Sequence, residues 1–440
     1  MKLVPATLAA LAAAVFAAAA PTQGQDASSF DARIAAEVER QAPEIIEVRH
    51  RIHQNPELGN REYETAELVA ERLRRLGFEE IQTGVAHTGV VALLRGGRPG
   101  PVVAVRADMD ALPVTEDTPY PFRSTKRTEY LGQEVGVSHA CGHDIHVAVQ
   151  LGVAAVLASL RDEIPGTIKF IFQPAEEGPP PGEEGGANLM VAEGVLEDPR
   201  PSAIFGLHSF AEMPVGRVGY TPGPALAAVD HFIARIIGTQ AHGAAPHLGV
   251  DPVVMAAQAV MALQTIRSRN LDPLQPSVVT VGLIRGGTRF NIIPGEVEIE
   301  GTVRTYDEAT RDAVERRMGE ILAGITAAGG GSYELQYDRG TPATINDTEL
   351  TRRMAPTLAR VAGAEQVDVL VPTMGGEDFA YFANEVPGFF FRLGTVDPER
   401  GSGGHHTPDF MADDASIPIG MRIMSALLLD YLSAQRGATE

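Results

Sequence analysis

Residues 101–113 read PVVAVRADMDALP, and this stretch decides the class of fold. Its first five residues are apolar and rich in valine, which is typical of a strand buried on both faces of a parallel sheet. The run leads directly to Asp108, so a carboxylate stands at the expected carboxyl end of the strand. In sheets whose strands alternate with helices, ligands bind beyond that end of the strands. We therefore expect a functional site beside Asp108.

Other apolar runs predict the remaining strands of the same sheet. They cover residues 90–94, 167–172, 203–207 and 389–393. Residues 145–160 are apolar nearly all round, which is typical of a buried helix, and helical spacings recur between residues 31 and 78. Strands that alternate with helices predict an α/β domain with a largely parallel sheet and helices on both faces.

The pattern changes between residues 228 and 338. Strands are predicted at 232–237, 277–284, 296–304 and 333–337, with helices at 252–266 and 308–327. The order βαββαβ is that of the ferredoxin-like unit. We therefore predict a ferredoxin-like α+β domain over residues 228–338, inserted into an α/β domain made of residues 25–227 and 339–440.

Residues 1–24 are expected to be a signal peptide. Lys2 precedes an alanine-rich apolar run over residues 8–20, and small and polar residues follow it. A membrane anchor is the alternative, but the run is short and alanine-rich for a span. We expect the mature protein to be exported to a bacterial periplasm and to hold no membrane span. The formal net charge of −21 argues against nucleic acid as a partner.

Residues 138–146 read SHACGHDIH and hold Cys141, the only cysteine of the chain. Thiolate and imidazole are preferred ligands of borderline-soft divalent metals, and Gly142 lets the chain turn so that Cys141 and His143 reach one ion. The alternative is a buried free cysteine beside ordinary histidines. Exported proteins use cysteines in pairs, so a lone cysteine favours a partner other than sulfur, such as a metal.

Two adjacent carboxylates, Glu176 and Glu177, follow the strand at 167–172. Neighbouring side chains on an extended segment point in opposite directions, so one carboxylate can bind a metal while the other faces a substrate. A solvated acidic pair is the alternative. The apolar strand that leads straight into the pair favours a site.

Further histidines occur after a predicted strand and after a loop near the C-terminus. His208 follows the strand at 203–207, and His405 and His406 follow a glycine-rich loop. A lone histidine is more often structural than a ligand. Taken with Cys141 and the carboxylates, these imidazoles are sufficient for a two-metal hydrolytic centre.

Several segments resemble the M20 metallopeptidase family, and within it the branch of N-acyl-amino-acid amidohydrolases that includes hippurate hydrolases and auxin-conjugate (IAA-amino acid) hydrolases. The segments run in family order over nearly the whole mature chain. They are RHRIH (49–53) with PEL (56–58), RADMDALP (106–113), HACGHDIH (139–146), QPAEE (173–177), GLH (206–208), AHGAAPH (241–247), FNIIP (290–294), GEDF (376–379) and HTP (406–408). The resemblance implies a di-metal aminopeptidase-like catalytic domain.

The resemblance also implies a role for each matching residue. It implies two divalent metal ions per subunit, Mn²⁺ or Zn²⁺ first and Co²⁺ or Ni²⁺ as alternatives. The implied ligands are Cys141, His143, Glu177, His208 and His406. Glu176 matches the general base, and Asp108 stands where relatives place an aspartate that orients the metal centre. His139 and His146 are expected to support the site, and His405 is expected to be a spare neighbour of His406.

The resemblance implies that residues 228–338 are a lid and dimerisation domain, inserted into a catalytic metal-binding domain of residues 25–227 and 339–440. Residues of this lid complete the site that the resemblance implies. His242 and Asn291 match polar groups that approach the active site in family dimers, His242 usually that of the partner subunit, so a homodimer through the lid is expected. Arg304 could bind the carboxylate of the substrate. Its alternative is an arginine on a solvated face among Glu296, Glu298 and Glu300. The loops at 178–186 and 401–405 depart from the family pattern and leave substrate specificity open.

We therefore expect a metal-dependent hydrolase that cleaves the amide bond of N-acyl-amino acids or amino-acid conjugates. A carboxypeptidase or dipeptidase acting on short peptides is the alternative within the same chemistry. A non-catalytic periplasmic metal- or ligand-binding protein is the alternative from another class. Glu176 favours an enzyme, because a protein without catalysis has no reason to place a base beside a metal ligand.

Overall fold

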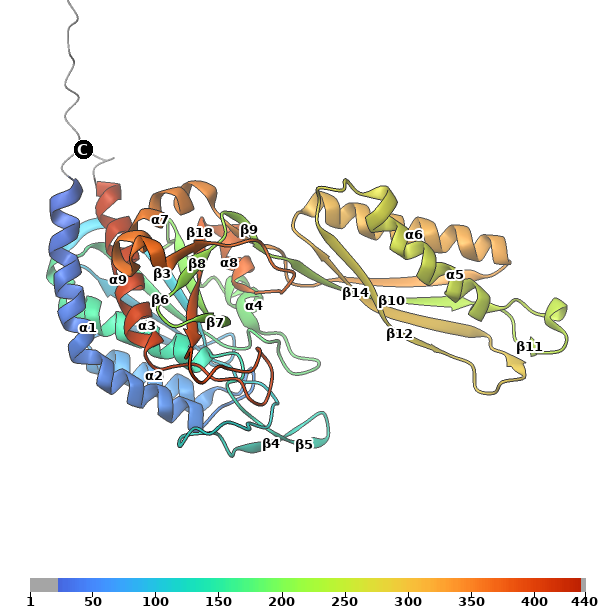
Figure 1. Ribbon diagram of the computed structural model, residues 1–440, viewed down its shortest axis with the longest axis horizontal. Coiled ribbons are helices and arrows are strands. Elements are labelled where there is room, and N and C mark those ends of the chain that lie inside the picture. Colours follow the sequence, from blue (N-terminus) through green and yellow to red (C-terminus); the bar gives the residue numbers. More distant parts are fainter. Residues whose placement is uncertain (1–22, 437–440) are drawn as a thin grey trace, which may run out of the picture.

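The computed structural model describes residues 23–436, so residues 1–22 of the predicted signal peptide lie outside the described part. The chain forms a large α/β domain and a smaller α+β domain that extends from it (Figure 1). The predicted class of fold is confirmed.

The large domain is built on an eight-stranded sheet with the order β1-β2-β6-β3-β7-β18-β8-β17. The four central strands β6, β3, β7 and β18 are parallel to one another, while β1, β2 and β8 introduce antiparallel pairs. The bounds are β1 Glu80–Val85, β2 Gly89–Arg95, β3 Arg98–Asp108, β6 Pro165–Gln173, β7 Ile204–Pro214, β8 Val218–Tyr220, β17 Val367–Val369 and β18 Gly388–Val396. All nine residues of β6 are buried, as expected for a central strand.

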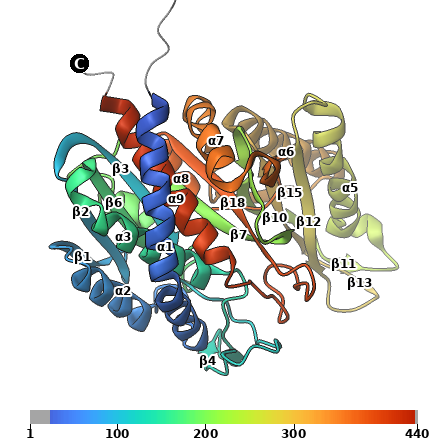
Figure 2. The same ribbon diagram turned by 60° about the vertical axis from the view of Figure 1, so that its left-hand side comes forward.

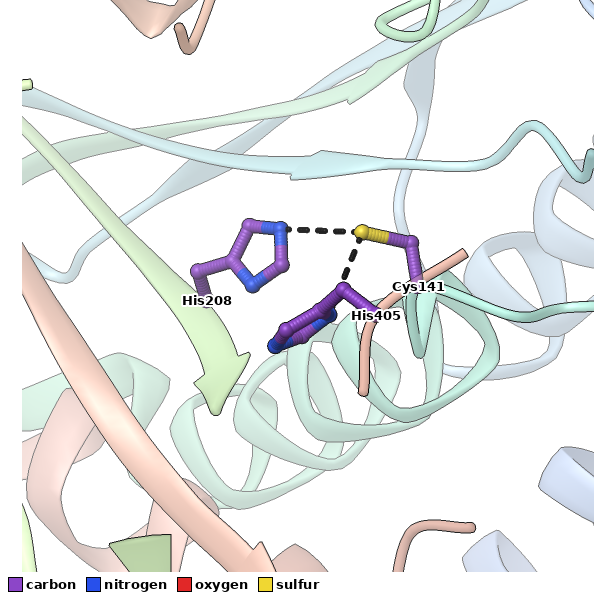
Figure 3. A group of neighbouring side chains, drawn as sticks. All are labelled: Cys141, His208 and His405. Carbon is purple, nitrogen blue, oxygen red and sulfur yellow. Dashed lines mark hydrogen bonds between the residues drawn. The ribbon is translucent and has the colours of Figure 1, made fainter. Parts of the chain in front are cut away.

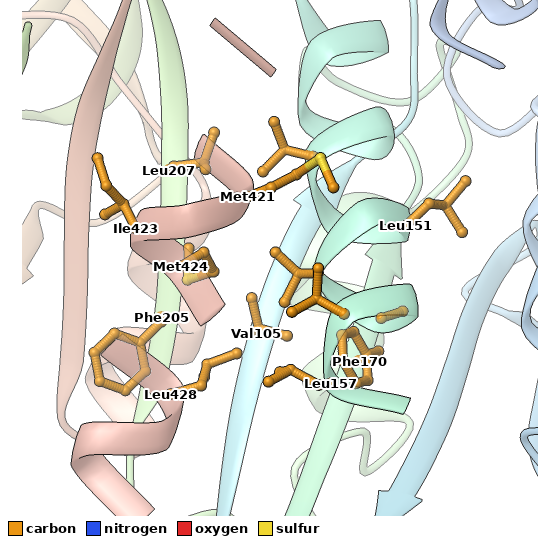
Figure 4. Packing of buried hydrophobic residues seen from close by; sticks show 14 of the residues in the cluster. Val105, Leu151, Leu157, Phe170, Phe205, Leu207, Met421, Ile423, Met424 and Leu428 are labelled. Carbon is orange, nitrogen blue, oxygen red and sulfur yellow. The ribbon is translucent and has the colours of Figure 1, made fainter. Parts of the chain in front are cut away.

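Helices cover both faces of this sheet. On one face α3 (His143–Ser159) and α9 (Ser416–Arg436) pack against the strands, and α1 (Gln23–Gln54) packs against these two helices (Figure 2). Met424 of α9 lies beside Val105 and Leu207 of the sheet, while Met421 reaches Gly152 of α3 (Figure 4). The other face packs against α4 (Gly186–Ala192) and α8 (Phe379–Glu385). Two further helices, α2 (Tyr63–Arg75) and α7 (Thr348–Ala362), complete the domain.

One described helix, α9, is long and apolar enough to cross a membrane. Of the stretch Ser416–Ala434, however, 67% is buried inside the protein. Its apolar residues belong to the main core with α1 and α3, which accounts for its composition.

The smaller domain, here called the lid, is a four-stranded antiparallel sheet with the order β12-β14-β10-β15. The observed order along the chain is βαββαβ. Its elements are β10 Ala228–Ile237, α5 Pro252–Thr265, β12 Ser277–Gly286, β14 Glu296–Thr305, α6 Glu308–Gly329 and β15 Ser332–Arg339. Phe232, Ile299 and Leu322 lie in a core of its own between sheet and helices. Asp251 caps α5 by accepting from Val253 N at 2.9 Å.

Two features of the fold differ from the sequence-based expectation. The strand predicted at 203–207 continues to Pro214 as β7, so His208 lies inside a strand and not beyond its end. The sequence does not predict the hairpin of β4 (Arg127–Tyr130) and β5 (Gln133–Gly136), because its residues are polar and show no buried face. Both features border the site described next.

Candidate metal centre

The carboxyl ends of the central strands bring the predicted ligands together. Asp108 is the last residue of β3, and Glu176 and Glu177 follow β6 directly. Cys141 and His143 flank Gly142, which has a φ of 88° at the start of α3. A Cβ at Gly142 would lie 2.3 Å from Ser209 Oγ, so the position requires glycine.

His143 is held as a metal-binding imidazole would be. Its Nδ1 lies 3.2 Å from Asp110 Oδ1, so Nδ1 carries the proton and donates it to the carboxylate. Its Nε2 is buried and has no hydrogen-bond partner among the described residues. That nitrogen lies 3.8 Å from Glu176 Oε2 and 4.0 Å from Glu177 Oε1. The ring nitrogen that could bind a metal therefore points between two carboxylates.

Two imidazoles approach the thiol of Cys141 (Figure 3). The Sγ atom lies 3.5 Å from His208 Nε2 and 3.5 Å from His405 Nδ1. Burial raises the pKa of the Cys141 thiol well above its ordinary value, and the negative charges of Glu177 and Glu176 add to this. A cation beside the sulfur would reverse that effect, because it favours the thiolate.

The backbone fixes the tautomer of both histidines beside Cys141. His208 Nδ1 lies 2.5 Å from Ser209 O, which can only accept, so His208 Nε2 keeps a free lone pair toward the sulfur. Ala211 N donates to His405 Nε2 at 3.0 Å, so His405 carries its proton on Nδ1 and can donate it to the sulfur. His208 is thus arranged as a ligand and His405 as a hydrogen-bond donor to the thiolate.

Glu177 connects the cysteine side of the site to His406. His406 Nε2 lies 3.0 Å from Glu177 Oε1, and His406 N donates to Ala140 O at 2.8 Å. His406 has a φ of 65°, an unusual conformation for a residue other than glycine. Burial alone would raise the pKa of Glu177, but the hydrogen bond from His406 and the charge of His143 lower it below its ordinary value. Glu177 is therefore an anion.

Glu176 points away from Cys141 toward a second pair of acids. Asp378 N lies 3.4 Å from Glu176 Oε1, and the carboxylates of Glu377 and Asp378 are buried beside it. Burial raises the pKa of Glu176 well above its ordinary value, and the charges of Glu377 and Glu177 contribute. A carboxylate with a raised pKa is a suitable proton acceptor near neutral pH.

Asp108 takes part in a buried network behind the ligands. Arg106 donates to Asp108 Oδ2 at 2.7 Å and to Asp378 Oδ1 at 2.8 Å. His146 Nδ1 lies 2.5 Å from Asp108 Oδ1, while Ser209 N donates to His146 Nε2 at 2.7 Å. Both ring nitrogens of His146 are therefore engaged, which leaves no lone pair for a metal. Asp108 and His146 lie behind the ligands and support them.

The sequence-based interpretation missed Asp110. Its Oδ1 faces His143 Nδ1, and its Oδ2 accepts from Glu177 N at 2.9 Å. One buried carboxylate thus orients two predicted ligands. The sequence does indicate a role for Asp110. It stands two residues after Asp108 in the stretch 106–113, and side chains two apart on an extended chain point to the same side.

The predicted lid residues do not reach this site within one chain. His242 lies in β11 (Ala241–His242), which pairs with β13 (Ile292–Ile293) at the end of the lid far from the large sheet (Figure 1). Asn291 precedes β13, and its Oδ1 is buried without a partner among the described residues. Arg304 lies in β14. No hydrogen bond joins any of the three to the ligands in the described part of the chain.

Arg304 is not a member of a solvated charge cluster, which was its alternative role. Glu298 and Glu300 are paired with Arg285, at 3.0 and 2.7 Å. Arg304 Nη1 is buried and has no acceptor among the residues that the structure describes. Burial lowers the pKa of Arg304 from its ordinary value.

The donor atoms fit divalent metal ions. In five groups of three described residues, the possible ligand atoms all lie within 4.8 Å of one another. Three of these groups hold two or more of the predicted ligands, namely Cys141 with Glu177 and His406, His143 with Glu176 and Glu177, and Cys141 with His208 and His405. Thiolate, imidazole and carboxylate suit Zn²⁺, Mn²⁺ and related ions. Burial opposes a charge on His143, yet Asp108 and Asp110 raise its pKa to about 10. The site therefore favours positive charge.

Comparisons with known proteins identify the family of this chain. The model of Peptidase family M20/M25/M40 matches residues 104–430. The chain is 44% identical over 306 residues to the N-acyl-L-amino acid amidohydrolase of Geobacillus stearothermophilus, covering 70% of this chain and 79% of that protein. It is 38% identical over 390 residues to thermostable carboxypeptidase 2 of Saccharolobus solfataricus, covering 88% and 95%.

A solved structure shares both the fold and the metal chemistry. The Bacillus subtilis YXEP protein, a dinuclear metal binding peptidase from the M20 family, superposes with a TM-score of 0.76 at 33% identity. The match covers 90% of this chain and 99% of that one. The chain therefore belongs to peptidase family M20/M25/M40 and is a metal-dependent hydrolase.

Proposed function

We propose that this enzyme hydrolyses the amide bond of N-acyl-amino acids or amino-acid conjugates. The observation that carries the proposal is the position of Glu176, whose carboxylate lies 3.8 Å from His143 Nε2 and beside the ligand Glu177. A proton acceptor next to a metal centre is what amide hydrolysis by water requires. The similarity to an N-acyl-L-amino acid amidohydrolase supports this substrate class.

The ligands in this proposal are Cys141, His143, Glu177, His208 and His406, with two divalent ions per subunit. Mn²⁺ or Zn²⁺ is our first choice, and Co²⁺ or Ni²⁺ also suits the mixed donors. When bound, such an ion lowers the pKa of a coordinated water to about 7 and polarises the scissile carbonyl.

Glu176 has the central catalytic part. It takes a proton from the attacking water and later gives that proton to the leaving amine nitrogen, so one carboxylate serves both steps. Asp110 keeps His143 and Glu177 in position, and Asp108 keeps His146 and Arg106 in position behind them.

The lid supplies the remaining groups in this proposal. In a homodimer, His242 and Asn291 of one subunit would approach the site of the other, because neither reaches the site of its own chain. Arg304, whose guanidinium has a buried nitrogen without an acceptor among the described residues, would bind the carboxylate of the substrate.

A dimer interface on the lid has physical support. The strand β12 is an edge of its sheet, and Leu283 and Ile284 on it are exposed. Val254 and Met261 of α5 are exposed as well, at 54% and 74%. An exposed edge strand beside apolar side chains is a typical surface for pairing with a second copy.

A peptidase acting on short peptides is the second candidate, supported by the similarity to a thermostable carboxypeptidase. We also propose that residues 1–24 direct the enzyme to a periplasm. The test of substrate class is a panel of N-acetyl, N-benzoyl and indole-acyl amino acids with dipeptides, assayed with each metal. Faster cleavage of the N-acyl substrates is expected, and cleavage of dipeptides alone would contradict the proposal.

A further inference from the structure

A cavity of about 490 Å³ adjoins the metal centre on the side of Glu177. Asp110 and Glu177 line one end of it, so a molecule in the cavity would reach the ligands. The cavity lies within the catalytic domain, and its lining includes no residue of the lid as described.

The walls of the cavity are mainly apolar. Its apolar lining includes Pro56, Leu58, Leu112, Tyr130, Leu131 and Pro180. They come from four places in the sequence: the turn after α1, the segment after β3, the β4–β5 hairpin, and the proline-rich loop at 178–186. The catalytic mechanism uses neither the hairpin nor this loop.

The proline-rich wall is tied in place by one acidic side chain. Arg61 Nη2 donates to Glu183 Oε1 at 2.5 Å, and Asn60 Nδ2 donates to Glu183 Oε2 at 3.1 Å. Glu183 thereby holds Pro180 and Pro181 against the cavity. It also neutralises Arg61, which lines the cavity, so that this cation does not attract an anion.

We propose that this cavity is the acyl-binding subsite and that it selects large apolar acyl groups, aromatic or medium-chain, over acetyl. This inference rests on the proposed function. A substrate has two halves on either side of the scissile carbonyl, and the half without a charge belongs in the apolar cavity. A cavity of about 150 Å³ holds benzene, so an acetyl group leaves most of the present volume unfilled.

The expected selectivity follows from buried area. Each additional buried methylene group is worth about fourfold in binding. Extending an acyl group from acetyl to hexanoyl adds four methylenes, so complete burial of all four would raise kcat/KM by about 250-fold, and we expect a rise of at least about 10-fold. Lys126 also lines the cavity, and an acyl group that ends in a carboxylate is the competing occupant.

The experiment compares N-acetyl, N-hexanoyl, N-benzoyl and N-succinyl derivatives of one amino acid with the metal-loaded enzyme. In wild type, hexanoyl and benzoyl substrates should exceed acetyl by at least about 10-fold in kcat/KM. Thr128→Trp, which places an indole in the cavity, should lower the hexanoyl-to-acetyl ratio by about the same factor. Arg127→Trp is the matched control, because Arg127 does not line the cavity and its guanidinium is paired with Glu134, so this variant should keep the wild-type ratio.

A second variant guards against misfolding of the first. Leu131 is 67% exposed at the hairpin tip, so Leu131→Ala should fold and lower the same ratio several-fold. Equal rates on acetyl and hexanoyl substrates, a preference for succinyl, or unchanged ratios in both variants would overturn the acyl subsite while leaving amide hydrolysis intact. Failure to cleave any N-acyl-amino acid would instead overturn the proposed function itself.

Discussion

The carboxylate of Asp110 accepts a hydrogen bond from the backbone N–H of Glu177 at 2.9 Å. Its second oxygen faces His143, so one buried acid orients two predicted ligands that lie 34 positions apart in the sequence. We therefore expect metal binding to depend on a residue that is not itself a predicted ligand.

Replacing Asp110 should weaken metal binding without removing a ligand. We expect Asp110→Asn to lower metal affinity by about 10- to 100-fold, because the amide no longer fixes the tautomer of His143. Metal titration with a competing chelator measures this. The control is Asp368→Asn on the edge strand β17, which breaks an ion pair with Arg217. This variant should bind metal like wild type. Equal affinity in both variants would remove Asp110 from the support of the site.

Chelation should expose the thiol of Cys141. In the metal-loaded enzyme the sulfur is engaged, so a thiol reagent should react slowly, and removal of the metal should accelerate the reaction. Because Cys141 is the only cysteine, no other thiol of the chain reacts with the reagent. The variant Cys141→Ser measures the background reaction. The same reactivity with and without metal would show that the thiol is not a ligand.

The buried carboxyl of Glu62 should make the stability of the fold decrease as the pH rises. Its carboxylate accepts from Ala175 N at 2.8 Å beneath the loop that carries Glu176. Burial, and then the charge of Asp110, raise the pKa of Glu62 from 4.5 to about 8. The folded protein therefore holds this proton more tightly than the unfolded chain. The stability it contributes is full below about pH 4.5 and is lost as the pH rises through about 8.

The test of this dependence is Glu62→Gln, which keeps an acceptor for Ala175 N. The free energy of unfolding of the variant relative to wild type should rise between about pH 5 and 8, by at most about 1.4 kcal/mol per pH unit. Thermal or urea unfolding at several pH values measures the difference. A constant difference across this range would contradict the raised pKa.

A charge on the lid edge should dissociate the proposed dimer. Ile284 on β12 is 59% exposed, and Ile284→Lys places an ammonium in the apolar surface. We expect a monomer in light scattering and a loss of activity, because the His242 that the second subunit supplies would be withdrawn. Gln336→Lys on the opposite edge strand β15 is the control and should remain dimeric. A monomeric wild type would rule out the interface.

Much of the fold was predictable because its central strands are apolar runs bounded by turns. The βαββαβ order of the lid could be predicted from its alternating strands and two helices. The hairpin of β4 and β5 was not predictable, because polar residues such as Arg127 and Glu134 carry no burial pattern. It is also the part of the chain that lines the acyl cavity.

That these thiol, imidazole and carboxylate side chains gather at one place was predictable, but the contacts that support them were not. A sequence shows that Cys141 and His143 are close, because only Gly142 separates them. It does not show that Ala211 N fixes the tautomer of His405, since that contact joins residues 194 positions apart. Long-range hydrogen bonds of this kind depend on the packing of the whole domain.

The central claim is that Glu176 is the general base of a metal-dependent amidohydrolase. The most direct measurement is kcat together with metal content for Glu176→Gln, on the best substrate of the N-acyl panel. The account predicts a loss of at least about 100-fold in kcat with the metal content of wild type. Wild-type rates in this variant would contradict it.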